Sequence, residues 1–156
     1  MLLLSFNMPE AKTFCEELMN RSDLSVNPKV LAWIGRVFIY GGEASKGKKI
    51  LYDSLRMDPD NTEAQKAIKN IKASASLKNK ASDIFNNGDY KGAVEALDKC
   101  LTLDHLHLAY NSIINFNKGR AYTKLNQNEN SLICFNLSIL MNPNYNKALV
   151  ERGKLN

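Results

Sequence analysis

The residues of this sequence that could do chemistry are mainly cations and hydrogen-bond donors, and they suit the binding of anions. Lys78 is one example. It lies in the stretch LKNKASDIFNNGDYKGA, residues 77–93, on a helix face otherwise lined by small and polar residues. Ammonium and guanidinium groups form charge-assisted hydrogen bonds with carboxylates. The chain carries 21 Lys and Arg against 16 Asp and Glu, a net charge of +5, which favours acidic partners.

Catalytic and metal-binding arrangements are missing from the sequence. It contains no G-x-S-x-G, phosphate loop or paired-carboxylate pattern, so we expect neither an enzyme nor a cofactor. His105 and His107 could suggest a metal site, but few acidic or thiol ligands lie near them, and we expect no metal. Cys15, Cys100 and Cys134 are far apart without a C-x-x-C pair, which predicts small reduced core residues.

The elements that must position the cations are helices, since apolar residues recur with helical spacing almost throughout. Pro9, Pro28, Pro59 and Pro143 each mark a helix start or a turn. We expect helices at 9–20, 28–40, 44–57, 62–87, 90–103, 108–126, 129–141 and 145–156.

Three segments share a common spacing. Each starts with a small residue, has a large apolar or aromatic residue three positions later and Gly or Asn seven positions later. The first positions are Gly35, Ala81 and Gly119, and the last are Gly42, Gly88 and Asn126. This spacing is typical of the tetratricopeptide repeat, a pair of antiparallel helices of about 34 residues. The small residues let the two helices approach closely, and the Gly or Asn is expected to end the first helix in a left-handed conformation.

We therefore expect an all-α, right-handed tetratricopeptide-repeat solenoid, a single domain over 1–156. It comprises a partial repeat at 1–27, a repeat at 28–61, a repeat with an extended first helix at 62–107, a repeat at 108–144 and a half-repeat helix at 145–156. A terminal helix without its partner leaves apolar surface exposed. Leu2, Leu3, Leu4 and Phe6 are expected to cover that surface or to meet another chain, so the terminal helices are candidates for self-association.

One run is more specific than the repeats in general. LRMDPDNTEAQKAIKNIKASASLKNKASDIFNNGDYKGAVEAL, residues 55–97, resembles the repeat region of DnaJ-homologue co-chaperones, with an L-R-M-x-P-D start, a long lysine-rich helix and an F-x-x-G-x-Y hairpin. The resemblance continues through Asn117–Arg120 and Asn146–Ala148 and covers residues 28–153. Such co-chaperones end in a J domain whose His-Pro-Asp loop stimulates the Hsp70 ATPase. No His-Pro-Asp occurs here, so we expect a fragment or a shortened protein without that activity.

The resemblance implies a concave groove lined by the first helix of each repeat. In chaperone-binding members, a two-carboxylate clamp in this groove holds a chaperone tail that ends in Glu-Glu-Val-Asp. Lys78, Asn117 and Lys147 match clamp positions of the family. Ser82 replaces an asparagine, and Glu151 stands where an arginine is expected. We expect Glu151 to pair with Lys147 or with an arginine across the groove, Arg120, and thereby to weaken tail binding.

Further cations fall at groove positions of the family, namely Lys29, Arg36, Arg120 and Lys124, although a solvated helix face explains Lys29 and Lys124 equally well. Trp33 is also at a groove position, where it could stack in the groove or pack on the neighbouring helix, and we expect the packing. The series of Lys66, Lys69 and Lys72 is interpreted as a solvated face rather than a nucleic-acid site, because no aromatic or motif context accompanies it.

The sequence thus predicts a protein-interaction module of co-chaperone type that binds an acidic peptide or the C-terminal tail of Hsp70 or Hsp90. The alternative is a scaffold with a decayed clamp that binds another protein. The predicted peptide-binding residues are Lys78, Ser82, Asn117, Arg120, Lys147 and Arg36. We expect no nucleic-acid or membrane partner. The apolar start MLLLSF is too short for a membrane span and no targeting signal is evident, so the cytosol is the expected compartment.

Overall fold

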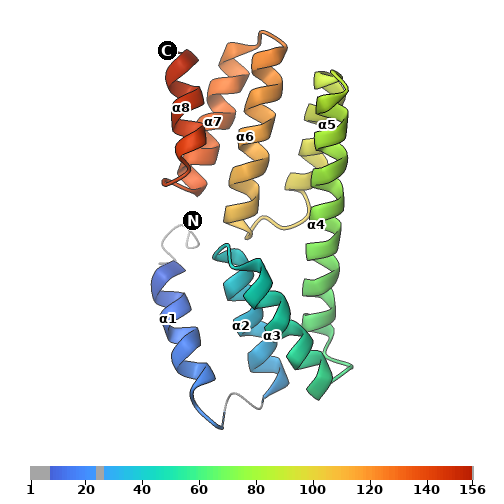
Figure 1. Cartoon of the computed structure of the whole chain (residues 1–156), viewed down its shortest axis with the longest axis vertical. Helices are drawn as coiled ribbons and strands as arrows, with labels where there is room; N and C mark the ends of the chain where they lie inside the picture. The colour runs from blue at the N-terminus through green and yellow to red at the C-terminus, as the bar shows by residue number, and fades with distance from the viewer. Residues whose placement is uncertain (1–7, 24–26, 156) are drawn as a thin grey trace. The chain divides into compact units, whose positions relative to one another are not determined.

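The computed structural model describes residues 8–23 and 27–155, and these form eight helices (Figure 1). They are α1 (Met8–Met19), α2 (Pro28–Tyr40), α3 (Ala44–Met57), α4 (Thr62–Asn86), α5 (Tyr90–Leu101), α6 (Leu108–Lys124), α7 (Asn128–Met141) and α8 (Asn146–Leu155). The predicted all-α class is confirmed, and each helix ends within about two residues of its predicted bounds. The expectation for Leu2, Leu3, Leu4 and Phe6 falls outside the described residues.

The chain divides into two compact units, Met1–Ile71 and Lys72–Asn156, with the division inside α4. In the first unit, α2 and α3 form an antiparallel pair, and in the second unit α6 and α7 form another (Figure 1). The second unit also contains the pair of α5 with the C-terminal part of α4, and α8 packs beside α7. Because α4 runs through both units, the single domain expected over 1–156 stays a prediction.

The first helix of each pair ends as predicted, in a left-handed residue. Gly42 has φ +88°, Gly88 has φ +85° and Asn126 has φ +58°. Asn126 is the one residue other than glycine with positive φ in the part of the chain that the structure describes. Asparagine tolerates this conformation better than most side chains, so the same turn is made three times by the two residue types that suit it.

The small residues at the helix crossings are required by close contact. A Cβ atom on Gly47 would lie 2.5 Å from the carbonyl oxygen of Gly35. A Cβ atom on Gly119 would lie 2.6 Å from Cε1 of Phe135, whose ring is fully buried. The predicted close approach of α2 to α3 and of α6 to α7 is therefore confirmed.

Serine hydroxyls form a set of buried interhelix bonds that the sequence analysis did not predict. Ser54 Oγ donates to the carbonyl oxygen of Pro28 at 2.7 Å, and Ser138 Oγ donates to that of Ser112 at 2.8 Å. Ser131 Oγ donates to the carbonyl oxygen of Gly119 at 2.8 Å. Each bond joins the second helix of a pair to the first. These serines therefore contribute a directional hydrogen bond as well as a small side chain where the helices cross.

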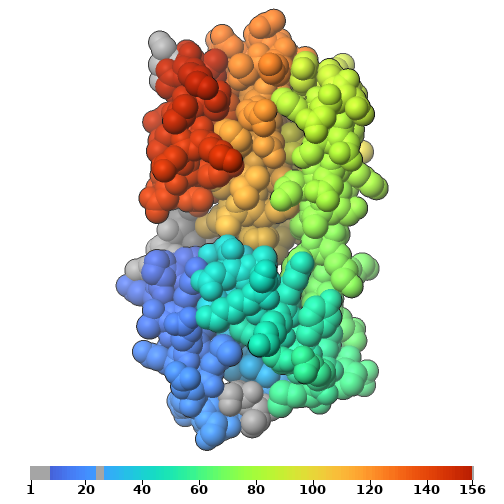
Figure 2. All heavy atoms as spheres, viewed as in Figure 1, coloured from blue at the N-terminus to red at the C-terminus, as the bar shows by residue number. Residues whose placement is uncertain are grey.

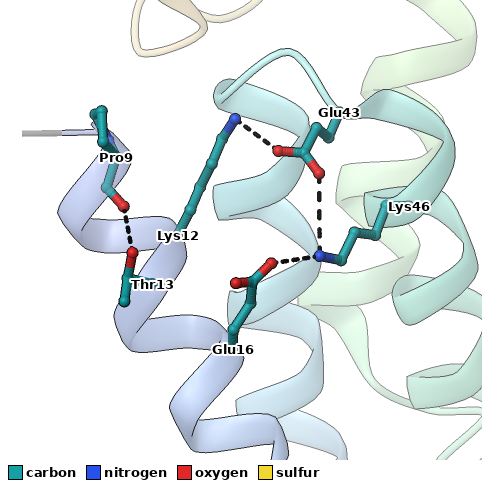
Figure 3. Close-up of polar contacts among 6 residues, drawn as sticks. All are labelled: Pro9, Lys12, Thr13, Glu16, Glu43 and Lys46. Atoms are coloured by element: carbon teal, nitrogen blue, oxygen red, sulfur yellow. Dashed lines mark hydrogen bonds and ion pairs between the residues drawn. The ribbon is translucent and has the colours of Figure 1, made fainter.

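Ion pairs attach α1 to the rest of the first unit (Figure 3). Lys12 Nζ lies 2.7 Å from Glu43 Oε1, and Lys46 Nζ lies 2.7 Å from Glu16 Oε1 and 4.0 Å from Glu43 Oε2. The hydrogen bond from Lys12 and the charges of both lysines lower the pKa of the Glu43 carboxyl. The atoms of α1 lie against those of α3 (Figure 2), while the apolar contact of α1 is centred on the buried Cys15.

All three cysteines are buried free thiols, as predicted. Burial raises the pKa of each thiol, which keeps it protonated and unreactive. Within residues 8–23 and 27–155, no helix is both long and apolar enough to cross a membrane.

Candidate peptide-binding site

The candidate site lies between α4 and α6 in the second unit. Ser82 and Asn86 are one turn apart on α4, and Asn117 and Arg120 are three residues apart on α6, so each pair shares one face of its helix. The α4–α5 hairpin is fixed by Ala81 and Leu97, which are buried together in one core cluster. Both α4 and α6 pack on α5, since Ala81 of α4 and Ile114 of α6 are buried in the same core cluster as Leu97 and Cys100 of α5.

These residues line an open pocket with a volume of about 160 Å³, and Ser82, Asn86 and Arg120 are exposed to solvent. It is lined by Ala81, Ser82, Phe85, Asn86, Leu97, Asn117 and Arg120. Three predicted peptide-binding residues, Ser82, Asn117 and Arg120, are therefore brought together in one cavity. Apolar Ala81 and Leu97 form its buried floor, and polar groups of two helices surround it.

Arg120 is held by aromatic rings. Its guanidinium carbon lies 5.0 Å from the centroid of Phe85 and 6.0 Å from that of Phe116. Such cation–π contacts orient the guanidinium without neutralising it. Among the described residues, no carboxylate pairs with Arg120 and no acceptor receives a hydrogen bond from it. The charge is close enough to Tyr145 to oppose the rise in the pKa of that phenol, which burial causes.

Lys78 lies one turn before Ser82 on α4 and is half-buried, but it does not line the pocket. Its ammonium charge acts on the Cys100 thiol, since it partly opposes the rise that burial causes in the pKa of Cys100. Lys78 forms no ion pair with a residue that the structure describes, so its charge is unneutralised. Lys78 on α4 is therefore a second unneutralised cation in the second unit, in addition to Arg120 on α6.

The two predicted clamp positions on α8 differ from each other. Lys147 is exposed and forms no ion pair in the described part of the chain. Glu151 bonds Lys154 of its own helix, with 2.7 Å between Oε1 and Nζ. The expected pairing of Glu151 with Lys147 or Arg120 is wrong, because the carboxylate forms its ion pair with Lys154, three residues further along α8.

Arg36 belongs to the first unit, where its Nη1 lies 3.3 Å from Glu63 Oε2 and its Nη2 donates to Tyr40 Oη at 3.3 Å. Its role in peptide binding stays a prediction. Trp33, three residues earlier on the same helix, is 58% exposed. The expectation that Trp33 packs on a neighbouring helix is wrong, since the buried face of α2 is formed by other residues, including Ile34, Val37 and Phe38.

The sequence does not predict Phe85 and Asn86 as lining residues. Phe85 enters it only as the aromatic residue of the F-x-x-G-x-Y hairpin, and Asn86 has no assigned role. Both lie three or four residues after Ser82, and this spacing places them on the same helix face. Extending each predicted site residue by one helical turn would have found them.

His107 packs against a neighbouring aromatic ring, while His105 is exposed. The ring of His107 stacks on that of Tyr110, with 5.5 Å between the centroids and 24° between the planes. In the residues that the structure describes, no three or more His, Cys, Asp and Glu side chains gather as a metal site would require.

Comparison with known proteins first identifies the class. Residues 113–145 match the tetratricopeptide repeat family, and this range covers most of α6, all of α7 and the turn that follows. The match agrees with the geometry of the α6–α7 pair, in which Gly119 crosses Phe135 closely and Asn126 makes the left-handed turn. The chain therefore contains a tetratricopeptide repeat, as its sequence predicts.

The more particular resemblance is also confirmed. The chain is 28% identical over 134 residues to the DnaJ homolog subfamily C member 7 homolog of Schizosaccharomyces pombe, which is 84% of this chain and 28% of that protein. It is 28% identical over 146 residues to DnaJ homolog subfamily C member 7 of Mus musculus, and 27% identical to that of Homo sapiens. Each of these two alignments covers 94% of this chain and 29% of the relative, so the chain spans less than a third of the length of these relatives.

Proposed function

We propose that the chain is a protein-interaction module of chaperone pathways, and that the groove of its second unit binds an acidic peptide, the C-terminal tail of an Hsp70 or Hsp90 chaperone. The observation that carries this proposal is the convergence of Ser82, Asn117 and Arg120 from two helices on one pocket. A peptide that ends in acidic residues needs donors arranged in this way, from more than one helix.

The relatives support the chaperone connection, because they are named as DnaJ homologs. The unneutralised charges of Lys78 and Arg120 support the preference for an acidic ligand. We place the interaction in the cytosol, since the three cysteines are free thiols, as is usual in reducing compartments.

The test is calorimetric titration of the whole chain with a peptide that ends in Glu-Glu-Val-Asp. Lys78→Ala should weaken binding roughly ten- to hundredfold, because a hydrogen bond to a charged group contributes about 1.5–3 kcal/mol. Lys80→Ala is the matched control, since Lys80 is an exposed lysine two residues further along α4. Binding that is equally strong in the Lys78→Ala and Lys80→Ala variants would rule out this clamp, and an absence of binding would rule out the tail as ligand.

The second candidate is a scaffold with a decayed clamp that binds another protein. Glu151 favours it, because a carboxylate held by Lys154 stands where the family has an arginine. Glu151→Arg discriminates between the two functions. It should strengthen tail binding if the clamp geometry persists and leave the affinity unchanged if the clamp has decayed, while Glu151→Gln separates the loss of a negative charge from the gain of a positive one.

A further inference from the structure

The last described helix, α8, has one open side. In the α2–α3 and α6–α7 pairs, a glycine of the first helix is covered by the second helix. A Cβ atom on Gly35 would lie 2.9 Å from Cγ of Leu51, and one on Gly119 would lie 2.6 Å from Cε1 of Phe135. Gly153 follows Gly119 by one repeat of 34 residues, but a Cβ atom on Gly153 meets nothing within 4 Å. The residues that the structure describes therefore leave this face of α8 uncovered.

The open face of α8 is apolar at its centre and basic at its edge. Leu149 and Val150 are exposed, and both lie within one turn of Gly153. Lys147 and Lys154 are exposed on either side of Val150. Lys154 is paired within its own helix, whereas Lys147 forms no ion pair with a residue that the structure describes. Such a face suits an acidic surface that carries an apolar side chain.

The first described helix, α1, has a complementary open face. Its Cys15 side packs in the core with α2, and its opposite side carries Glu10, Thr13, Phe14 and Glu17, which are all exposed. These four residues form one stripe, because they are three and four positions apart along the helix. Neither Glu10 nor Glu17 forms an ion pair with a described residue. The helix therefore presents a phenylalanine between two unneutralised carboxylates.

The charges of the two faces match in spacing. On each helix, two like charges lie seven residues apart, which is about 10.5 Å along the axis. Placing Phe14 opposite Val150 in an antiparallel pair, the arrangement that α2–α3 and α6–α7 adopt, brings each carboxylate of α1 opposite a lysine of α8. The facing residues would be Glu17 with Lys147 and Glu10 with Lys154.

Contact between two copies of the same helix is unfavourable. Two α8 faces packed on each other would bring their exposed lysines together, and two α1 faces would bring their exposed glutamates together. Like charges that meet at an interface oppose association. The charges therefore favour contact between α8 and α1 over contact of either helix with itself.

We propose that the open face of α8 binds α1 of a second copy of this chain. Phe14 packs on Val150 and covers the open side of Gly153, and the flanking charges set the register. The contact uses a different surface on each partner, so it leaves one α1 and one α8 free and permits assemblies longer than a dimer. This interface does not depend on the proposed tail binding, because neither Phe14 nor Val150 is a predicted clamp residue.

The contact is weaker than the helix pairs within the chain. In those pairs, the large residue that covers the glycine follows a small residue by four positions, as Leu51 follows Gly47 and Phe135 follows Ser131. In α1 the residue four positions before the phenylalanine is Glu10, which keeps the two helices further apart. A single contact between two helices is also small for an interface, so we expect a Kd of about 10–1,000 µM.

The first experiment is sedimentation of the whole chain over a concentration range of about 10–1,000 µM. We expect the weight-average mass to rise with concentration and to pass that of a dimer, because contacts between unlike surfaces need not close. Added salt should weaken the association, since it screens exposed charges. A mass that stays that of the monomer throughout this range would overturn the proposal.

Variants of the two apolar centres locate the contact. Phe14→Lys and Val150→Asp each introduce the charge that the opposite face already carries, and each should weaken association at least tenfold. The matched controls are Trp33→Lys and Ile133→Asp, since Phe14 and Trp33 are 56% and 58% exposed and Val150 and Ile133 are both 57% exposed. The controls should associate as the wild type does. A loss of association in a control, or its persistence in Phe14→Lys or Val150→Asp, would place the interface elsewhere and refute the proposal.

Mixing the two variants tests whether the contact joins unlike helices. Alone, Phe14→Lys and Val150→Asp should stay monomeric, but an equimolar mixture should associate. The intact α8 face of the first variant then meets the intact α1 face of the second, and this rescue cannot arise from contact of either helix with itself. It also shows that both variants are folded. A mixture that stays monomeric would contradict the proposed pairing.

A charge exchange tests the register. Glu17→Lys and Lys147→Glu should each weaken association about two- to tenfold, and the chain that carries both substitutions should regain most of the loss. If the double variant associates no better than either single variant, these two residues do not face each other and the antiparallel register is wrong.

Discussion

Replacing Gly119 with alanine tests whether the close crossing of α6 and α7 is a necessary part of this fold. The added Cβ would lie 2.6 Å and 2.7 Å from two atoms of the Phe135 ring. That ring is fully buried and contacts Phe116, with 5.9 Å between the centroids, so it has no free space to move into. Overpacking of this kind costs about 1–3 kcal/mol.

The higher helix propensity of alanine offsets part of this packing cost. Alanine is better than glycine in a helix by about 1 kcal/mol, so the net loss for Gly119→Ala is roughly 0–2 kcal/mol. Gly153 on α8 provides the matched control, because a Cβ added there meets nothing within 4 Å. Gly153→Ala should be neutral or stabilising by up to about 1 kcal/mol. The difference between the two variants isolates the packing cost at about 1–3 kcal/mol.

Amide hydrogen exchange in α6 and α7 measures the free energy of opening for this helix pair. Gly119→Ala should reduce the protection of these amides, and adding Phe135→Leu should restore part of the loss relative to Phe135→Leu alone, because the shorter side chain makes room for the methyl group. The reasoning is refuted if Gly119→Ala is as stable as Gly153→Ala, or if Phe135→Leu gives no rescue.

Two further predictions concern polar contacts. The pKa of the Glu43 carboxyl is lowered mainly by the hydrogen bond from Lys12, so the stabilisation is present above the unfolded pKa and is lost as the pH falls through the folded pKa. Carbon NMR titration of that carboxyl should show a pKa below the ordinary glutamate value, and Lys12→Gln should raise it, which an unchanged titration curve would contradict. Ser138→Ala removes the hydroxyl that bonds the Ser112 carbonyl at 2.8 Å, and it should cost about 1 kcal/mol in the same exchange experiment, where unaltered protection would argue against the bond.

Much of the fold is predictable from the sequence because it depends on local chemistry. Asn27 caps α2 by accepting from the backbone of Lys29 and Val30, and Pro28 occupies the first turn. Gly42 adopts positive φ at the end of α2, where the sequence predicts a left-handed residue. Such signals act within a few residues and need no knowledge of what packs against the helix.

The departures come from contacts between side chains, which helix periodicity does not fix. Trp33 stands at a groove position of the repeat, where packing on the neighbouring helix is expected, yet it is 58% exposed. Glu151 could reach several cations from its helix, and the one it bonds, Lys154, is decided by rotamers along α8. The stacking of Arg120 on Phe85 depends on the distance between α4 and α6, which the repeat pattern does not specify.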